Sequence, residues 1–209
     1  MLGAPREHQA RDTKIKSGLG YSVSISLQYF SVRYEGNPCS DTYRGDSADS
    51  EAETKAYQAL FDQIKGSYSS TPKAYVSLHS YSQKIISSYA ASYSAVPEDP
   101  DSISDLTESG RRVAEAMTNV YGNKYQYGQA RDIMYPASGS TKDWVLATQG
   151  VPLAWTWELR YGSRSDFKIT HAFRDTGLYG FLLPPDQIYP QFDELIAGMI
   201  ALFEFVNEN

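Results

Sequence analysis

Helix-like and strand-like spacings of apolar residues alternate along this chain from residue 50 to its end. Such alternation is typical of an α/β fold in which helices flank a mostly parallel mixed sheet. The expected elements, in chain order, are a helix over 50–65, a strand over 74–80, a candidate strand over 84–89, a helix after the loop at 95–102 that ends at Gly122, a short helix between Thr141 and Gly150, a strand over 152–160, and a helix over 186–207. We therefore predict a single α/β domain with a mostly parallel mixed sheet.

In two of these helices, the spacing of apolar residues indicates which face is buried. Ser50 and Glu53 stand at the start of the first helix with the spacing of a capping box. The expected buried face of that helix consists of residues four apart, namely Ala52, Ala56, Leu60 and Ile64. The expected buried face of the closing helix consists of Leu195, Met199, Leu202 and Phe205. Both helices are therefore expected to cover the sheet.

The amino-terminal region has a different character. Residues 1–20 show no periodicity and are expected to form a flexible arm. Residues 21–30 alternate apolar residues with serines, which predicts a strand with one buried face. We expect residues 21–209 to form one domain. The start of the chain lacks the apolar core of a signal peptide, so its composition alone indicates a protein that is not secreted.

Composition excludes several kinds of partner. The chain has 209 residues, a net charge of −6 and no basic stripe, which argues against binding to nucleic acid or anionic membranes. Its apolar content of 41% and charged content of 21% are ordinary for globular proteins. The longest apolar runs are far shorter than the roughly 18 residues that a membrane span requires. We therefore expect neither nucleic acid nor a membrane as a partner.

Two polar side chains end apolar strands. His79 follows the apolar segment YVSL, and Glu158 follows AWTW. Ligands of open α/β sheets gather outside the carboxyl ends of the strands. Histidine suits zinc, and a nearby carboxylate can take a proton from water bound to the metal. A histidine held by structural hydrogen bonds and a solvated or paired glutamate are the more frequent situations, so the spacing leaves both interpretations open.

Five stretches in a fixed order distinguish between these interpretations. They are NPCSDTYRG (37–45), SLHSYSQ (77–83), YPASGSTKDW (135–144), WTWELR (155–160) and DTGLYGFLLP (175–184). Together they resemble the C-terminal half of zinc metallocarboxypeptidases of the pancreatic carboxypeptidase A/B type. The resemblance covers about residues 34–209, apart from 161–174. It implies an incomplete version of the zinc carboxypeptidase fold, zinc as the cofactor, and hydrolysis of the C-terminal residue of peptides.

The resemblance also implies roles for individual residues. His79 matches the family's third zinc ligand, and Glu158 matches the glutamate that activates the attacking water. Tyr135 matches the mobile tyrosine that closes over the C-terminus of a peptide. The positions that match substrate-contacting residues are Ser80, Tyr81, Phe181 and Lys142. The partners implied are peptide or protein C-termini, and the protein implied is a secreted, extracellular monomer.

Lys142 matches the base of the pocket for the terminal side chain, so the resemblance implies a preference for acidic C-termini. Simpler interpretations remain open at the substrate-contacting positions. Tyr81 and Phe181 can be core packing, because aromatic side chains often fill cores. Lys142 can be a solvated surface charge, because lysine is mostly exposed. Gly139 and Ser140 can form an ordinary turn.

Several parts of the family pattern have no counterpart in this chain. Its histidines stand at 8, 79 and 171, and none is followed by Glu three residues later, so the His-x-x-Glu pair of zinc ligands is missing. The Asn-Arg dipeptide that holds a substrate's terminal carboxylate is missing too. The lone Cys39 matches a cysteine whose disulfide partner lies upstream in the family. The insert at 161–174, beside Glu158, is either a family-specific loop or a retained intron read as coding sequence, and the clean join of ELR to DTG around it favours the intron.

Three hypotheses follow from these gaps. The chain is an incomplete copy of a zinc carboxypeptidase that is inactive alone, a non-catalytic pseudoenzyme that binds peptide C-termini, or the product of a wrongly assembled gene that never folds.

Overall fold

The computed structural model describes residues 39, 46, 47, 49–68, 70–90, 100–137, 139–160 and 181–209, with residues 100–102 described by their backbone alone. The predicted arm at 1–20, the predicted strand at 21–30 and the insert at 161–174 lie outside the described residues.

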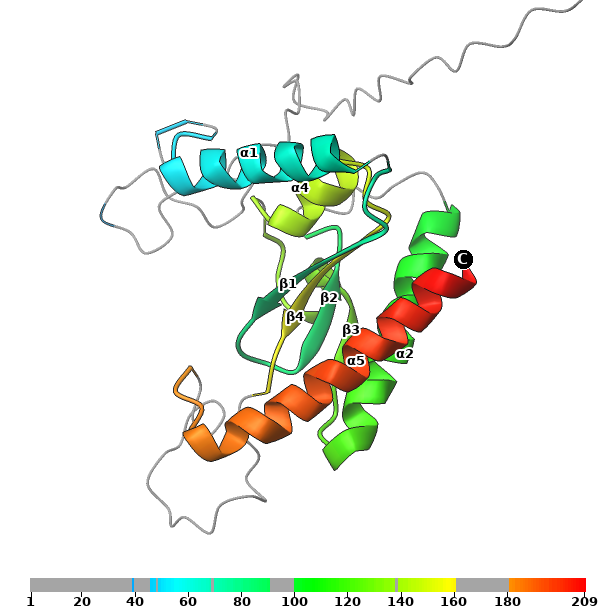
Figure 1. Cartoon of the computed structure of the whole chain (residues 1–209). Helices are drawn as coiled ribbons and strands as arrows, with labels where there is room; N and C mark the ends of the chain where they lie inside the picture. The colour runs from blue at the N-terminus through cyan, green and yellow to red at the C-terminus, as the bar shows by residue number, and fades with distance from the viewer. Residues whose placement is uncertain are drawn as a thin grey trace, which may run out of the picture.

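A mixed sheet of four strands forms the centre of the described part of the chain (Figure 1). The strands are β1 (Ala74–His79), β2 (Lys84–Ser87), β3 (Gln126–Gln129) and β4 (Leu153–Glu158), in the spatial order β1-β4-β2-β3. β1 is parallel to β4, and β2 is parallel to β3, while β2 and β4 are antiparallel. The prediction of a mostly parallel mixed sheet is therefore confirmed.

Helices cover both faces of this sheet. The helices are α1 (Ala52–Ser67), α2 (Pro100–Tyr121), α3 (Ala130–Ile133), α4 (Thr141–Ala147) and α5 (Ile188–Glu208), and a single 3-10 turn, η2 (Pro185–Gln187), precedes α5. Figure 1 shows α1 and α4 together above the sheet, and α2 and α5 packed against each other on its other side. Within the described residues, no helix is long and apolar enough to cross a membrane.

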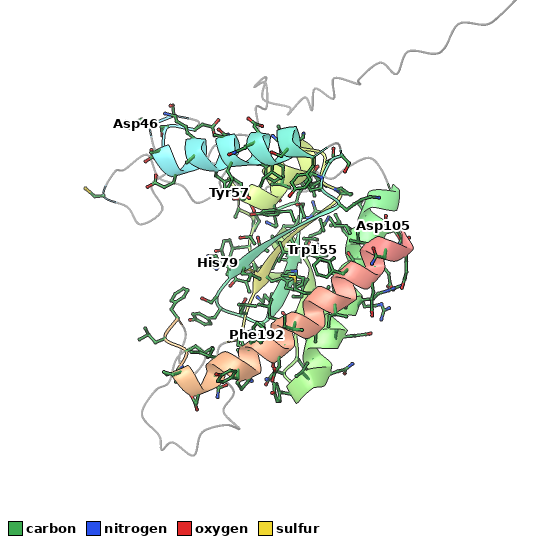
Figure 2. The ribbon with its side chains drawn as sticks, in the orientation of Figure 1. Asp46, Tyr57, His79, Asp105, Trp155 and Phe192 are labelled. Atoms are coloured by element: carbon green, nitrogen blue, oxygen red, sulfur yellow. The ribbon has the colours of Figure 1, made fainter. Side chains whose placement is uncertain are left out.

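The larger core lies between the sheet and the pair α2 and α5. Side chains alternate along a strand, so Trp155 and Trp157 of β4 point together into this core. Figure 2 places Trp155 between the sheet and the long helices. The other members of this core include Ile85, Val113, Met117, Leu202 and Phe205. The predicted buried face of the closing helix is confirmed, since Leu195 and Met199 also pack against this core.

The opposite face of β4 belongs to a second core. Ala154 packs with Phe61 of α1 and with Trp144 of α4. The rings of Phe61 and Trp144 meet edge to face, with their centroids 5.5 Å apart. Because Thr156 and Glu158 follow Ala154 at intervals of two, their side chains point to this same face of the sheet. The face of the sheet that carries Glu158 is therefore the one covered by α1 and α4.

Two predictions about α1 are wrong. Ser50 does not cap the helix, because its hydroxyl donates a hydrogen bond to Oε1 of Glu51 at 2.6 Å and α1 has no side-chain cap. The predicted apolar face is also misplaced, since Leu60 is 52% exposed and Ala52 and Ala56 are exposed as well. The helix instead turns Tyr57 and Phe61 toward α4, because aromatic rings bury more apolar area than the alanines do.

Two further differences concern the sheet. The apolar segment YVSL is typical of a buried strand, but among the described strands β1 is an edge strand, and Leu78 is 48% exposed. β3 and α3 were not predicted, because the segment QYGQ has no apolar alternation. β3 is a strand because β2 pairs with it, and Tyr125, just before it, is buried in the larger core.

Candidate active site

The parallel pairing of β1 and β4 brings His79 and Glu158 together. The two residues are directly paired in the register of the strands, at their carboxyl ends. Nδ1 of His79 lies 3.0 Å from Oε1 of Glu158. The imidazole is 61% exposed whereas the carboxylate is 8% exposed. Figure 2 shows His79, the last residue of β1, at the carboxyl end of that strand. The two residues that the sequence placed at strand ends thus form one site.

Glu158 keeps one oxygen for further chemistry. Its Oε2 is buried and accepts no hydrogen bond from the described residues. A buried carboxylate oxygen without a donor is costly, so it marks a place where a proton, a donor or a cation is stabilising. An exposed imidazole beside such an oxygen suits proton transfer or metal binding.

Lys142, in the first turn of α4, lies inside the protein rather than on its surface. The residue is 3% exposed, which contradicts the interpretation of a solvated surface charge. Its Nζ donates a hydrogen bond to Oγ of Ser140 at 2.7 Å and lies 3.6 Å from Oδ1 of Asp143. Burial lowers the pKa of Lys142, and the carboxylate of Asp143 acts in the opposite direction. Lys142 is therefore a buried amine whose charge depends on Asp143.

Tyr81 and Phe181 form an aromatic pair beyond the end of β1. Their ring centroids are 5.0 Å apart and their planes are inclined by 81°, an edge-to-face arrangement. Phe181 is 73% exposed, so the interpretation that it fills the core is wrong. Ser80 is half-buried beside Tyr81, and Tyr135 is exposed in the connection between α3 and α4. The structure thus joins Tyr81 to Phe181, as it joins His79 to Glu158, while Tyr135 and Lys142 lie on other segments.

Asp143 is a polar residue of this region that the sequence reasoning missed. Its side chain is buried, and its Oδ2 accepts a hydrogen bond from the backbone N–H of Ala90 at 2.8 Å. The signal was present in the sequence, since Lys142 and Asp143 are adjacent opposite charges in the apolar helix TKDWVLA.

His79 and Glu158 provide only part of what a zinc site requires. Zinc in proteins takes three or four ligands from histidine, cysteine and carboxylate side chains. His79 and Glu158 supply one imidazole and one carboxylate, and no cluster of three such side chains exists within the described ranges. The described residues therefore do not complete a zinc site.

Known proteins are similar to this chain in sequence. The sequence model of the family described as zinc carboxypeptidase matches residues 28–198. Carboxypeptidase A1 of Homo sapiens is 37% identical over 168 residues, which are 80% of this chain and 34% of the human protein. Carboxypeptidase B of Bos taurus is 34% identical over 193 residues, which are 92% of this chain and 41% of the bovine protein.

A solved structure agrees with this assignment. Bovine thrombin-activatable fibrinolysis inhibitor, in complex with tick carboxypeptidase inhibitor, superposes with a TM-score of 0.67 at 28% identity, over 88% of this chain and 57% of that protein. The chain spans between about a third and two fifths of the length of the two curated relatives. The match nevertheless extends over most of the chain itself, in both sequence and fold. This protein therefore belongs to the zinc carboxypeptidase family.

Proposed function

We propose that this chain supplies His79 and Glu158 to the active site of a carboxypeptidase that removes the C-terminal residue of peptides. The observation that carries the proposal is the 3.0 Å contact between His79 Nδ1 and Glu158 Oε1 at the carboxyl ends of two parallel strands. In this proposal Glu158 accepts a proton from the attacking water through Oε2, which accepts no hydrogen bond within the described part of the chain. His79 is the candidate metal ligand of the chain. The edge-to-face rings of Tyr81 and Phe181, with Ser80 beside them, contact the peptide, and Tyr135 closes over its end.

The same proposal holds that the chain does not catalyse this reaction alone. Its histidines are at 8, 79 and 171, and none has Glu three residues later, so this sequence lacks the His-x-x-Glu pair of zinc ligands. We propose that the remaining zinc ligands and the group that holds the substrate's terminal carboxylate come from further polypeptide of the same family. The resemblance to the family also makes an extracellular location and a monomeric state part of the proposal.

A zinc measurement tests this division of the site. The 209-residue chain is expected to lose zinc on dialysis, because His79 is its one proposed zinc ligand and zinc requires three or four. Zinc per chain is measured by mass spectrometry of the metal after dialysis, with His79→Ala as the paired variant. Retention of about one zinc per chain in the parent but not in the variant would show that the chain holds zinc ligands in addition to His79.

The proposed substrate class follows from Lys142. An ammonium about 4 Å from a carboxylate contributes roughly 4 kcal/mol of attraction at an effective dielectric constant near 20, before desolvation costs. The carboxylate of Asp143, 3.6 Å from Nζ, offsets part of this attraction. We therefore propose a preference for peptides that end in Glu or Asp. The expected ratio of kcat/KM between acidic and apolar C-termini is about tenfold, which corresponds to about 1.4 kcal/mol.

A chimera tests this preference. Residues 28–209 without 161–174 are joined to the preceding amino-terminal part of human carboxypeptidase A1, and kcat/KM is compared for peptides that end in Glu, Leu and Arg. The Glu peptide is expected to be the best substrate, and Lys142→Ile is expected to favour the Leu peptide. Lys73→Ile, at an exposed lysine before β1, is the matched control and should leave the order unchanged. A Leu peptide cleaved equally well by the parent chimera and by its Lys142→Ile variant would remove Lys142 from substrate selection.

A non-catalytic binder of peptide C-termini is the second candidate. The incomplete set of metal ligands among the described residues favours it, and so does the exposed aromatic surface of Phe181. Peptide binding by the chain alone, together with an inactive chimera, would favour this candidate over the first.

A further inference from the structure

Lys142 and Asp143 form a buried ion pair whose net charge is zero. Both residues are almost fully buried, and Nζ of Lys142 lies 3.6 Å from Oδ1 of Asp143. That separation is too long for a hydrogen bond, but it is short enough for a strong Coulomb interaction away from water. The ammonium instead donates its hydrogen bond to Oγ of Ser140. Oδ1 of Asp143 accepts no hydrogen bond from the described residues, so its charge acts on Lys142 through space.

Asp143 is itself held in place from another part of the fold. Its Oδ2 accepts the backbone N–H of Ala90 at 2.8 Å, a contact between α4 and the segment after β2 that is 53 residues away in sequence. This contact fixes the carboxylate. The neighbouring phenol of Tyr89 is buried, and burial together with the Asp143 charge raises its pKa, so the phenol stays neutral near pH 7. Among the described residues, Asp143 is thus the group whose charge bears on the Lys142 amine.

These contacts have two opposite consequences for a carboxylate that approaches Lys142. A buried amine without a counter-ion tends to lose its proton, because burial disfavours the charged form. Asp143 opposes this loss, because its negative charge favours the protonated amine. The same carboxylate, however, already interacts with the ammonium. It therefore reduces the net electrostatic attraction between Lys142 and a second, incoming carboxylate.

We propose that Asp143 is a positioning residue that keeps the Lys142 ammonium charged and fixed inside the protein, and that it limits how strongly this ammonium attracts a carboxylate of a bound peptide. The second half rests on the proposed function, in which Lys142 meets the terminal side chain of the substrate. Lys142 then makes the site favour an acidic terminal side chain, and its pairing with Asp143 determines how strong that preference is.

The experiment uses the full 209-residue chain and does not depend on catalysis. The 13Cε and 15Nζ resonances of its lysines are followed by NMR as a function of pH, and Lys142→Arg identifies the Lys142 signal. In Asp143→Asn the side-chain amide oxygen can still accept the Ala90 N–H, so the fold is expected to persist, which circular dichroism checks. Loss of an opposite charge at this distance is expected to lower the pKa of Lys142 by about 1–3 units. Asp62→Asn, which removes an exposed carboxylate on α1, is the matched control and should leave the Lys142 titration in place.

Ser140→Ala gives an independent test. It removes the hydrogen-bond acceptor of Nζ but no charge, so it is expected to move the Lys142 pKa less than Asp143→Asn does. A Lys142 titration that is unchanged in Asp143→Asn would overturn the proposal. So would a Ser140→Ala chain in which Lys142 loses its charge near neutral pH while Asp143 is intact.

The same samples separate this proposal from the proposed function. N-benzoylglycyl-glutamate and N-benzoylglycyl-leucine are added at a pH at which Lys142 is charged in both chains. The glutamate peptide is expected to shift the Lys142 signal, and to do so at about a tenfold lower concentration in Asp143→Asn. Weaker or equal binding to that variant contradicts the proposed effect of Asp143 on the attraction. If neither peptide moves the signal in either chain while Asp143→Asn still lowers the pKa, the ion pair stands and the acidic preference of the proposed function fails.

Discussion

Glu158→Gln is expected to lower kcat of the chimera by a factor of about 10²–10⁴ and to leave KM nearly unchanged. Glutamine has the size of glutamate and can keep a hydrogen bond to Nδ1 of His79, which lies 3.0 Å from Oε1 of Glu158 in the parent chain. It cannot accept a proton from water, so the loss falls on the chemical step and not on peptide binding. Steady-state kinetics with a Glu-ended peptide give the two constants separately.

The control for this variant is Glu204→Gln, an exposed glutamate on α5, which should leave both constants as in the parent chimera. A loss in kcat of less than about tenfold for Glu158→Gln would show that Glu158 is not the proton acceptor. A rise in KM with kcat unchanged would assign Glu158 to substrate binding instead.

Among the proposed substitutions, Glu194→Ala is expected to lower the free energy of unfolding the most. Glu194 is fully buried in α5, and its Oε2 lies 3.6 Å from Nε of the buried Arg160. Its Oε2 accepts a hydrogen bond from the hydroxyl of Tyr125, and its Oε1 accepts one from Nδ2 of Asn123, both at 2.8 Å. Burial, followed by the Glu194 charge, raises the pKa of Tyr125, so its hydroxyl remains a donor.

Removing one partner from a buried charged network costs about 3–5 kcal/mol, because the Arg160 guanidinium stays buried and loses the carboxylate of Glu194. For a chain of this size that corresponds to a fall in Tm on the order of 6–20 °C. Urea unfolding followed by circular dichroism measures the change in the free energy of unfolding. Glu204→Ala, on the same helix but exposed, is the matched control and should lie within about 0.5 kcal/mol of the parent. Equal stability of the two variants would mean that the Glu194 network contributes nothing net.

This network also bears on the candidate active site. Arg160 follows Glu158 by two residues, and its backbone N–H donates a hydrogen bond to Oε1 of Gln191 at 2.7 Å. The chain after Glu158 is therefore attached to α5 through both the backbone and the side chain of Arg160. In the chimera, Glu194→Ala is expected to reduce activity through loss of this attachment, without any contact between Glu194 and the substrate.

Local sequence pattern predicted the elements that carry the site. The strands that end at His79 and Glu158 were predicted from their apolar runs, α2 and α5 from apolar residues at helical spacing, and α4 from the loop before it and its end at Gly150. The periods of helices and strands follow from backbone geometry, so a segment of sequence is enough to reveal them. The ordered motifs then indicated the family, which the comparisons establish.

Which face of an element is buried, and which charges lie inside, depended on contacts between segments far apart in the chain. The apolar face predicted for α1 was wrong because Phe61, and not Leu60, packs against Trp144, which is more than 80 residues away in sequence. Asp143 was missed because its role depends on the N–H of Ala90 and on burial beside Lys142. Periodicity contains no information on such long-range pairs, because the free energy of a buried charge is set by what surrounds it in space and not by its neighbours in sequence. The sequence therefore shows which residues stand at the strand ends, and tertiary packing brings His79 to within 3.0 Å of Glu158 and buries Lys142 against Asp143.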